Sequence, residues 1–527
     1  MTSSTGRIMF RSTVFALSTL SLTCLAQETP DSWYEDGRNV VERNLAYRNL
    51  ASSNAIAKNV ILFVGDGMGV STVTAARILA GQLEGNPGEE NELFFETFPN
   101  VALSKTYNTD AQVPDSAGTM SAMVTGIKTD RGVISVNQNV SRGDCNSTQG
   151  NHTQTFLEHA ELKGLSTGVV STARLTHATP AANYAHTMER NYEDDRDAET
   201  LRVVGDCADI ARQLIEFVDN FPGSNGIEVA MGGGRRSFIP RVEGADPENN
   251  RQGERLDGRN LTDEWLNTLS NSAYVWNKEQ FDAIDVSSVD HLLGLFNASN
   301  MQYSHDTASD QGGEPSLSEM TEKAIELLSK NEDGFFLNVE AGRIDHAHHA
   351  LNPYRALTDT IELANAVQTA AEMVDLEETL IIVTADHSHV FTIAGYPKRG
   401  NPILGKVVGL DSAGEPRTEP SLAADGKPYT TLGYANGRGH YELPDRNTAD
   451  AIYTMPISDE RRNDLSEVDT THEGFHSEAL VPLGDETHAG EDVAIYAIGP
   501  GADLIRGVME QNVIFHVMME ASQLESR

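Results

Sequence analysis

The stretch "NVILFVGDGMG" (residues 59–69) indicates the class of fold. Its first part, 59–65, is an almost unbroken apolar run, which is typical of a strand buried on both faces of a parallel sheet. Asp66 follows at once, between glycines that let backbone and ligand approach closely. Because open α/β sheets bind ligands beyond the carboxyl ends of their strands, Asp66 is a candidate binding residue.

Five further short apolar runs have the same character, and helix-like segments lie between them. The runs are "STGVVST" (166–172), "GIEVAMGGG" (226–234), "GFFLNVE" (334–340), "TLIIVTAD" (379–386) and "DVAIYAIG" (492–499). The clearest helical segments are 316–330 and 354–374. We therefore predict an α/β fold, with a central, mostly parallel sheet flanked by helices on both faces. Residues 395–475 are rich in Gly, Pro and Asp and are predicted to form an irregular insertion on the rim of the sheet.

The charge balance excludes two classes of partner. The chain has 527 residues, of which 78 are acidic and 39 are Lys or Arg, for a formal net charge of -39. A nucleic-acid-binding surface or a general anionic-membrane binder is disfavoured, because phosphate groups would be repelled. The acidic excess is spread along the chain. We interpret it as a surface adapted to a salty (halophilic) medium, with simple solubility as the alternative.

The N-terminal residues predict export. Arg7 and Arg11 precede an apolar stretch that ends at Ala26, as in a signal peptide over 1–26. A lipid anchor on Cys24 is the weaker alternative, since Thr23 suits it poorly. No other stretch approaches the length of a membrane span, so the mature chain, 27–527, is predicted to have no transmembrane segment and to be periplasmic or secreted. It then keeps two cysteines, Cys145 and Cys207, which form a natural disulfide pair.

Asp, Glu and His residues gather where the predicted strands end. Asp345 and His349 are four residues apart, so a helical turn puts them on one face. The remaining members of these groups are Asp66, Glu340, Asp386, His387 and His488. Each group alone could be a helix cap or a polar loop, but groups at several strand ends favour metal binding. Carboxylates and imidazoles without cysteine suit catalytic Zn²⁺ and an all-oxygen Mg²⁺ site.

The stretch "VPDSAGTMSAMVTG" (113–126) is a turn that leads into a helix. Either Asp115 or Ser116 is its N-cap, or Ser116 is a nucleophile at a helix N-terminus that attracts anions. The chain has neither a GxSxG elbow nor a Walker A loop, which disfavours acyl transfer and nucleotide-driven phosphotransfer. Arg190 is a candidate cation for a phosphate group, with a surface salt bridge as its alternative.

Taken together, the motifs resemble the alkaline phosphatase family, and its animal branch more than the enterobacterial one. They include "GDGMG", "PDSAGTMSAMVTG", "HATPAANYAHTMERNY", "MGGGRRSF", "VEAGRIDHAHH", "TADHSHVF" and "GDETHAGEDVAIYA". The resemblance implies a metal-dependent homodimer that hydrolyses phosphate monoesters at alkaline pH through a phosphoserine and releases inorganic phosphate.

The resemblance also implies residue roles. Ser116 would become the phosphoserine, and Arg190, steered by Asp115, would bind the phosphate. Two Zn²⁺ and one Mg²⁺ are implied per chain. One zinc would lie on Asp345, His349 and His488, the second on Asp66, Asp386 and His387, and the magnesium on Asp66, Thr179 and Glu340. His177 and His346 match positions that tune the magnesium site and the phosphate. Cys145 and Cys207 match a disulfide of the animal branch.

Two features leave room for other interpretations. Asn297 stands where the animal enzymes have a carboxylate of a calcium site, to which Phe296 and Glu314 could still contribute, so a fourth metal is not expected. Residues 395–475 correspond to the crown-like region of relatives and diverge most. A phosphodiesterase of the same superfamily is therefore the alternative enzyme. A non-catalytic exported protein that binds zinc or phosphate is disfavoured by the complete set of residues.

Overall fold

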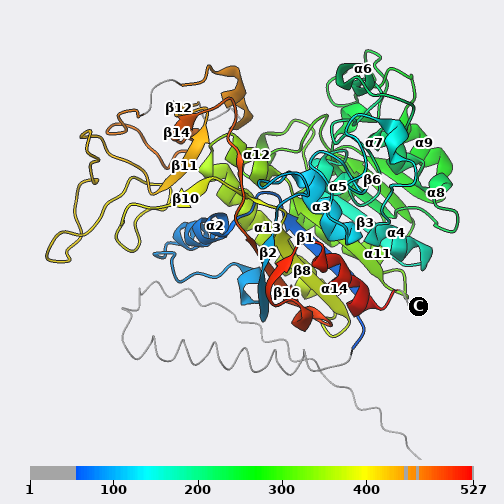
Figure 1. Ribbon diagram of the computed structural model, residues 1–527, viewed down its shortest axis with the longest axis horizontal. Helices are drawn as coiled ribbons and strands as arrows, with labels where there is room; N and C mark the ends of the chain where they lie inside the picture. Colours follow the sequence, from blue (N-terminus) through cyan, green and yellow to red (C-terminus); the bar gives the residue numbers. More distant parts are fainter. Residues whose placement is uncertain (1–54, 444–448, 459–461, 525–527) are drawn as a thin grey trace, which may run out of the picture. The chain divides into compact units, whose positions relative to one another are not determined.

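A ten-stranded sheet lies at the centre of the computed structural model, in the order β17-β2-β16-β8-β1-β7-β3-β4-β6-β5 (Figure 1). In this order β3 spans Ser166–Arg174 and β4 spans Val229–Gly233. The structure describes residues 55–443, 449–458 and 462–524. The predicted signal peptide and Cys24 lie outside these residues. No helix in the described part of the chain is both long enough and apolar enough to cross a membrane.

The register of three neighbouring strands fixes where the site forms. β1 (Asn59–Gly65) is hydrogen-bonded in parallel to both β7 (Phe335–Ala341) and β8 (Thr379–Ala385). Gly65 pairs with Ala341 on one side and with Ala385 on the other. Asp66 and Asp386 therefore leave the sheet at the same level, two residues beyond Glu340, which pairs with Val64. This register explains why acidic residues far apart in sequence lie together.

The predicted fold is confirmed, because helices cover both faces of this sheet. One group contains α2 (Val70–Leu83), α11 (Leu317–Leu328) and α13 (Pro353–Met373), of which α13 contacts both others. The other contains α3 (Ser116–Thr125), α4 (Phe156–Leu162) and α14 (Val513–Ser522). β7 and β8 are buried along their whole length, and β1 from its second residue, as the apolar runs predict.

One predicted strand runs in the opposite direction. β16 (Val493–Ile498) is antiparallel to both β8 and β2 (Asn100–Lys105), whereas we expect it to be parallel. The chain enters β16 from the His488 turn, which already lies at the carboxyl edge of the sheet, so the strand must run back. Four strands of this sheet are missed by the sequence analysis: β2, β5 (Ser272–Val275), β6 (His291–Leu295) and β17 (Gly507–Glu510).

Residues 395–475 contribute short elements rather than layers of the main sheet. β11 (Leu432–Gly437) pairs with β10 (Phe391–Ile393) and β14 (Ala479–Pro482) in a small separate sheet. β12 (Tyr441–Glu442) pairs with β13 (Phe475–His476), and η5 (Ala449–Thr454) is a 3₁₀ turn. Figure 1 shows β10, β11 and β14, drawn in yellow to orange, grouped near α2 and α12 (Arg343–His349).

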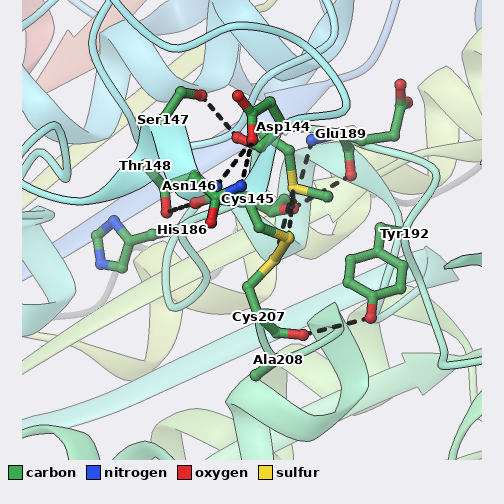
Figure 2. Close-up of a disulfide and its surroundings, with 12 residues drawn as sticks. Asp144, Cys145, Asn146, Ser147, Thr148, His186, Glu189, Tyr192, Cys207 and Ala208 are labelled. Atoms are coloured by element: carbon green, nitrogen blue, oxygen red, sulfur yellow. Dashed lines mark hydrogen bonds between the residues drawn. A yellow bond between two sulfur atoms is a disulfide. The ribbon is translucent and has the colours of Figure 1, made fainter. Parts of the chain in front are cut away.

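The predicted disulfide joins Cys145 and Cys207, whose Cα atoms are 5.8 Å apart (Figure 2). The Sδ atom of Met188 lies 3.8 Å from the sulfur of Cys145 and 3.7 Å from that of Cys207. Together with Tyr192 and three valines these residues form a small core of their own. The disulfide therefore stabilises the segment that leads from Met188 to Arg190.

Candidate active site

Ser116 is the first residue of α3, and Asp115 is its N-cap. Oδ1 of Asp115 accepts a hydrogen bond from the backbone N–H of Gly118 at 3.2 Å. The hydroxyl of Ser116 is not used for capping. It lies 3.2 Å from Nε2 of His387 and 3.5 Å from Oδ1 of Asp66, and only 2% of the residue is exposed. The start of α3 therefore places the Ser116 hydroxyl close to residues that follow β1 and β8.

Asp115 also fixes the predicted phosphate-binding cation. Its Oδ2 accepts a hydrogen bond from Nη1 of Arg190 at 3.0 Å. Nη2 of Arg190 lies 3.1 Å from Nε2 of His177. The guanidinium is thus held from two sides next to the N-terminus of α3. A surface salt bridge, the alternative interpretation of Arg190, does not fit its burial of more than four-fifths of the side chain.

Three imidazoles converge on one carboxylate oxygen, which makes a cluster of four residues. Oδ1 of Asp345 lies 3.3 Å from Nε2 of His349, 3.3 Å from Nε2 of His488 and 2.8 Å from Nε2 of His389. The structure therefore brings together the three residues predicted to share a zinc. It adds His389, which sequence analysis missed. Its position two residues after His387, on the same face of an extended strand, was the available signal.

The hydrogen bonds around these imidazoles favour a cation between them. Nδ1 of His349 lies 2.7 Å from the carbonyl of Glu486, and Nδ1 of His488 lies 2.9 Å from the carbonyl of Pro114. A carbonyl only accepts, so both Nδ1 atoms carry the proton. In the neutral imidazoles the two Nε2 lone pairs then face each other at 3.1 Å, beside Asp345. A metal ion removes this repulsion, and outward-facing Nδ1–H groups are usual for metal-bound histidine.

A second group surrounds Ser116. Nε2 of His387 lies 3.4 Å from Oδ1 of Asp66 and 3.3 Å from Oδ2 of Asp386, and all three side chains are completely buried. Burial raises the pKa of Asp66 well above its usual value, and repulsion by Asp386 and Asp345 raises it further. Several buried carboxylates this close together require a compensating cation. The fit to a second metal ion is therefore good.

A third group shares Asp66 with the second. Its ligand atoms come from Asp66, His177 and Glu340. Oδ2 of Asp66, Oε1 of Glu340 and Oγ1 of Thr179 are buried without a hydrogen-bond partner. Burial raises the pKa of Glu340 to about 8. Orphaned oxygens are what a hard divalent cation would satisfy. His177, predicted to tune this group, therefore supplies a nitrogen among its ligand atoms.

Comparison with known proteins agrees with this geometry. Residues 57–524 match the family model described as alkaline phosphatase. The chain belongs to the alkaline phosphatase family. It is 46% identical over 472 residues to the tissue-nonspecific alkaline phosphatase of Felis catus, covering 88% of this chain and 83% of that protein. The Homo sapiens tissue-nonspecific isozyme is 44% identical over 473 residues, covering 88% and 84%.

Solved structures support the same fold. The alkaline phosphatase of Thermus thermophilus is 23% identical, with a TM-score of 0.62, over 91% of this chain and 94% of that one. That of the Antarctic bacterium TAB5 is 22% identical, with a TM-score of 0.57, over 89% and 99%. The present alkaline phosphatase is therefore a metal-dependent phosphomonoesterase, as the resemblance of its motifs implies.

Two further predictions from the sequence of this alkaline phosphatase concern His346 and the surroundings of Asn297. The ring of His346 lies 5.4 Å from that of His177, and burial together with Arg343 lowers its pKa to about 3, so it is neutral. Around Asn297 the carboxylate of Glu314 is already satisfied. Oε1 accepts from Nδ2 of Asn297 at 2.8 Å and Oε2 from the N–H of Gln302 at 2.7 Å. Burial raises the pKa of Glu314 to about 8, and the absence of a fourth metal here stays a prediction from the sequence.

Proposed function

We propose that this alkaline phosphatase transfers the phosphoryl group of a monoester to Ser116 and then to water, at alkaline pH. The observation that carries the proposal is the position of one hydroxyl. Oγ of Ser116 lies within 3.5 Å of both His387 and Asp66, while the preceding residue, Asp115, holds Arg190. Nucleophile and phosphate-binding cation are thereby tied to the same helix start.

The proposed reaction has two chemical steps. In the first, Oγ of Ser116 attacks phosphorus, the bond to the ester oxygen breaks, and the alcohol leaves with the proton that Oγ gives up. In the second, a water oxygen attacks the phosphoserine, the bond between phosphorus and Oγ breaks, and Oγ takes up a proton of that water as inorganic phosphate forms. Two N–H groups of Arg190 match two non-bridging oxygens of the phosphoryl group, and the amides at the start of α3 favour its negative charge.

The donor atoms support the proposed metals. Mixed nitrogen and oxygen donors in the groups of Asp345, His349 and His488, and of Asp66, Asp386 and His387, suit Zn²⁺. The oxygens of Asp66, Thr179 and Glu340 suit Mg²⁺. Bound divalent ions would stabilise negative charge on the attacking and leaving oxygens. We assign His346 and His177 to the surroundings of the phosphate and the magnesium.

The same proposal includes export and a homodimer. A disulfide supports a periplasmic or secreted enzyme, in which 27–527 is the catalytic domain and 395–475 a crown-like insertion. Large apolar side chains are exposed on α2, where Leu83 is 65% exposed, and on the loop beside its end, where Tyr396 is 96% exposed. Gln82 ties that loop to α2 through Asn401 and Ile403. This exposed apolar area supports association of two copies, which light scattering would test.

The test is phosphoenzyme trapping with Ser116→Ala. Acid quenching with labelled p-nitrophenyl phosphate should label the parent and not the variant, while elemental analysis finds the same metal content in both. Ser121→Ala, one turn further along α3, is the matched control and should still be labelled. Label retained in Ser116→Ala would refute the nucleophile. Turnover that survives EDTA, or a higher rate on a diester than on the monoester, would refute the proposed reaction.

A further inference from the structure

α12 carries two residues of the four-residue cluster but is too short to hold itself in place. It spans Arg343–His349 and includes Asp345 and His349. Two helical turns are not stable in isolation, since most helical stability comes from tertiary packing. The orientation of Asp345 and His349 therefore depends on what packs against α12. Much of that packing comes from residues within or next to 395–475.

The first turn of α12 is held by Asp450 of η5. Nη2 of Arg343 lies 2.8 Å from Oδ2 of Asp450, and the hydroxyl of Tyr303 donates to Oδ1 of Asp450 at 2.7 Å. The Arg343 guanidinium also lies over the ring of Tyr303, 3.7 Å from its centroid. The Arg343 side chain is only 3% exposed, and its Nε has no hydrogen-bond partner in the described structure. Removal of Asp450 would leave a buried charge poorly compensated.

The last turn is held by Tyr434 of β11. The Tyr434 hydroxyl lies 2.9 Å from Nδ1 of His348, and Nε2 of His348 lies 2.9 Å from the hydroxyl of Thr72. The His348 ring in turn packs 4.9 Å from the ring of His389. Burial keeps the pKa of His348 well below its usual value, so the ring is neutral. Tyr434 thus contacts both the helix and, through His348, the remaining part of the cluster.

The residues that follow α12 are held as well. The Ala350 carbonyl lies 2.5 Å from Nδ1 of His476, and the Leu351 carbonyl accepts from the N–H of Ser477 at 2.8 Å. The Glu473 carbonyl accepts from Nδ2 of Asn352 and from Nη1 of Arg355. We name Tyr434, Asp450, Glu473 and His476 the α12 clamp. It contacts the helix at its start, near its end and immediately beyond it.

We propose that Asp450 and Tyr434 of the α12 clamp are positioning residues of the active site, which set the distance of Asp345 and His349 from His389 and His488. This rests on the proposed function, which assigns a metal to that cluster. Neither residue touches the cluster's ligand atoms. Asp450 acts through Arg343, two residues before Asp345, and Tyr434 acts through His348, one residue before His349. On this view the 395–475 region is a support for metal binding as well as a border of the site.

The experiment compares metal retention in Asp450→Asn and Tyr434→Phe with that in the parent. Asp425→Asn is the matched control, because Asp425 pairs with Arg462 within the same region and contacts no residue of α12. A competing chelator is titrated at constant pH and residual zinc is measured directly. We expect the chelator concentration that removes half of the zinc to fall roughly 3- to 10-fold in both variants. This is at or below the effect of changing a residue that hydrogen-bonds directly to a metal ligand. We expect no change in Asp425→Asn.

Two further variants separate this proposal from the one it rests on. His349→Ala should lose about one metal equivalent. If it does not, the assigned metal site is wrong whatever the clamp variants do. If it does, and Asp450→Asn and Tyr434→Phe retain zinc like the parent, only the clamp proposal is overturned. Asp450→Glu restores the charge and should recover much of the retention. A merely structural role predicts instead a lower melting temperature with unchanged zinc retention in the folded enzyme.

Discussion

Asp115 uses its two carboxylate oxygens for different partners, one for backbone amides and one for a guanidinium. Oδ1 accepts from the amides of Gly118 and Gly132, and Oδ2 accepts from Arg190. The sequence predicts a cap and a nucleophile at 115–116 but leaves open which residue has which task. The hydrogen bond to Gly118 identifies Asp115 as the N-cap, because an N-cap side chain lies beside the backbone whereas the next side chain points outward. Ser116 is therefore left available to the strand ends.

Substitutions at Asp115 separate its two tasks. Asp115→Asn keeps an oxygen that accepts from Gly118 but loses the charge that orients Arg190, whereas Asp115→Ala loses both. Phosphate inhibition constants should rise several-fold in both variants. Only Asp115→Ala should also lose about 1 kcal/mol of stability, the usual value of an N-cap. Inhibition by inorganic phosphate and denaturant unfolding measure the two effects. Equal losses of stability in both variants would contradict the assignment.

A second residue-scale prediction concerns Glu228, which is remote from the metal groups and only 6% exposed. It accepts from the N–H of Thr167, whose hydroxyl donates to Glu161. Burial, followed by repulsion from Glu161, raises the pKa of Glu228 to about 8. The folded state then binds a proton that the unfolded state releases near pH 4.5. Its stability contribution is full below pH 4.5 and declines as pH rises toward 8.

Glu228→Gln should therefore stabilise the protein at pH 9 relative to the parent, because it removes the buried charge. At pH 5 the difference should shrink, since the parent's carboxyl is then largely protonated. Melting temperatures of the two proteins at both pH values measure this. Glu332→Gln, at an exposed position, is the control and should show no such pH dependence. A stabilisation of Glu228→Gln that is equal at pH 5 and pH 9 would refute the charge argument.

At the scale of elements, apolar runs in the sequence predict the strands that precede the site residues, such as β1, but they do not predict β2 and β5. β1 begins and ends where the run 59–65 does, because both of its faces are buried. β2 alternates buried and exposed residues and β5 is mostly half-buried, so neither has such a run. Sequence patterns also group Asp66, Asp345 and Asp386 only as strand ends. The register that aligns them depends on pairing between distant segments, as does the approach of His389 to Asp345.

The disulfide also acts at the scale of elements, because it holds the segment that leads to Arg190 of the site. It joins cysteines 62 positions apart in the sequence and contacts Met188, two positions before Arg190. Replacing both cysteines by serine should cost about 2–5 kcal/mol of unfolding free energy. Because the proposed zinc ligands all lie outside 145–207, zinc content should stay unchanged while KM rises more than kcat falls. Urea unfolding, elemental analysis and steady-state kinetics test this. An unchanged KM would show that Arg190 is held without the disulfide.

At the scale of the whole molecule, charge is the dominant feature left outside the site. Because 78 acidic residues face 39 basic ones, only one Lys or Arg is available for every two carboxylates. The structure uses many of the arginines in buried pairs, such as Arg255 with Asp209 and Arg355 with Asp306. Few cations then remain to balance the exposed acids. The compact state is consequently opposed by self-repulsion, which added salt screens.

The melting temperature should therefore rise with salt. At 0.05 M NaCl the screening length exceeds 10 Å, and at 1 M it is about 3 Å, so repulsion between neighbouring carboxylates falls steeply. Each kcal/mol gained by screening should raise the melting temperature by about 2 °C in a chain of this size, since the effect per kcal/mol shrinks as domains grow.

NaCl and KCl should act equally, because screening depends on ionic strength alone. Sucrose at matched osmolarity is the control, since it favours compactness without screening charge. A melting temperature that falls with NaCl would mean that favourable ion pairs outweigh the repulsion. The acidic surface would then be a matter of solubility, not of adaptation to salt.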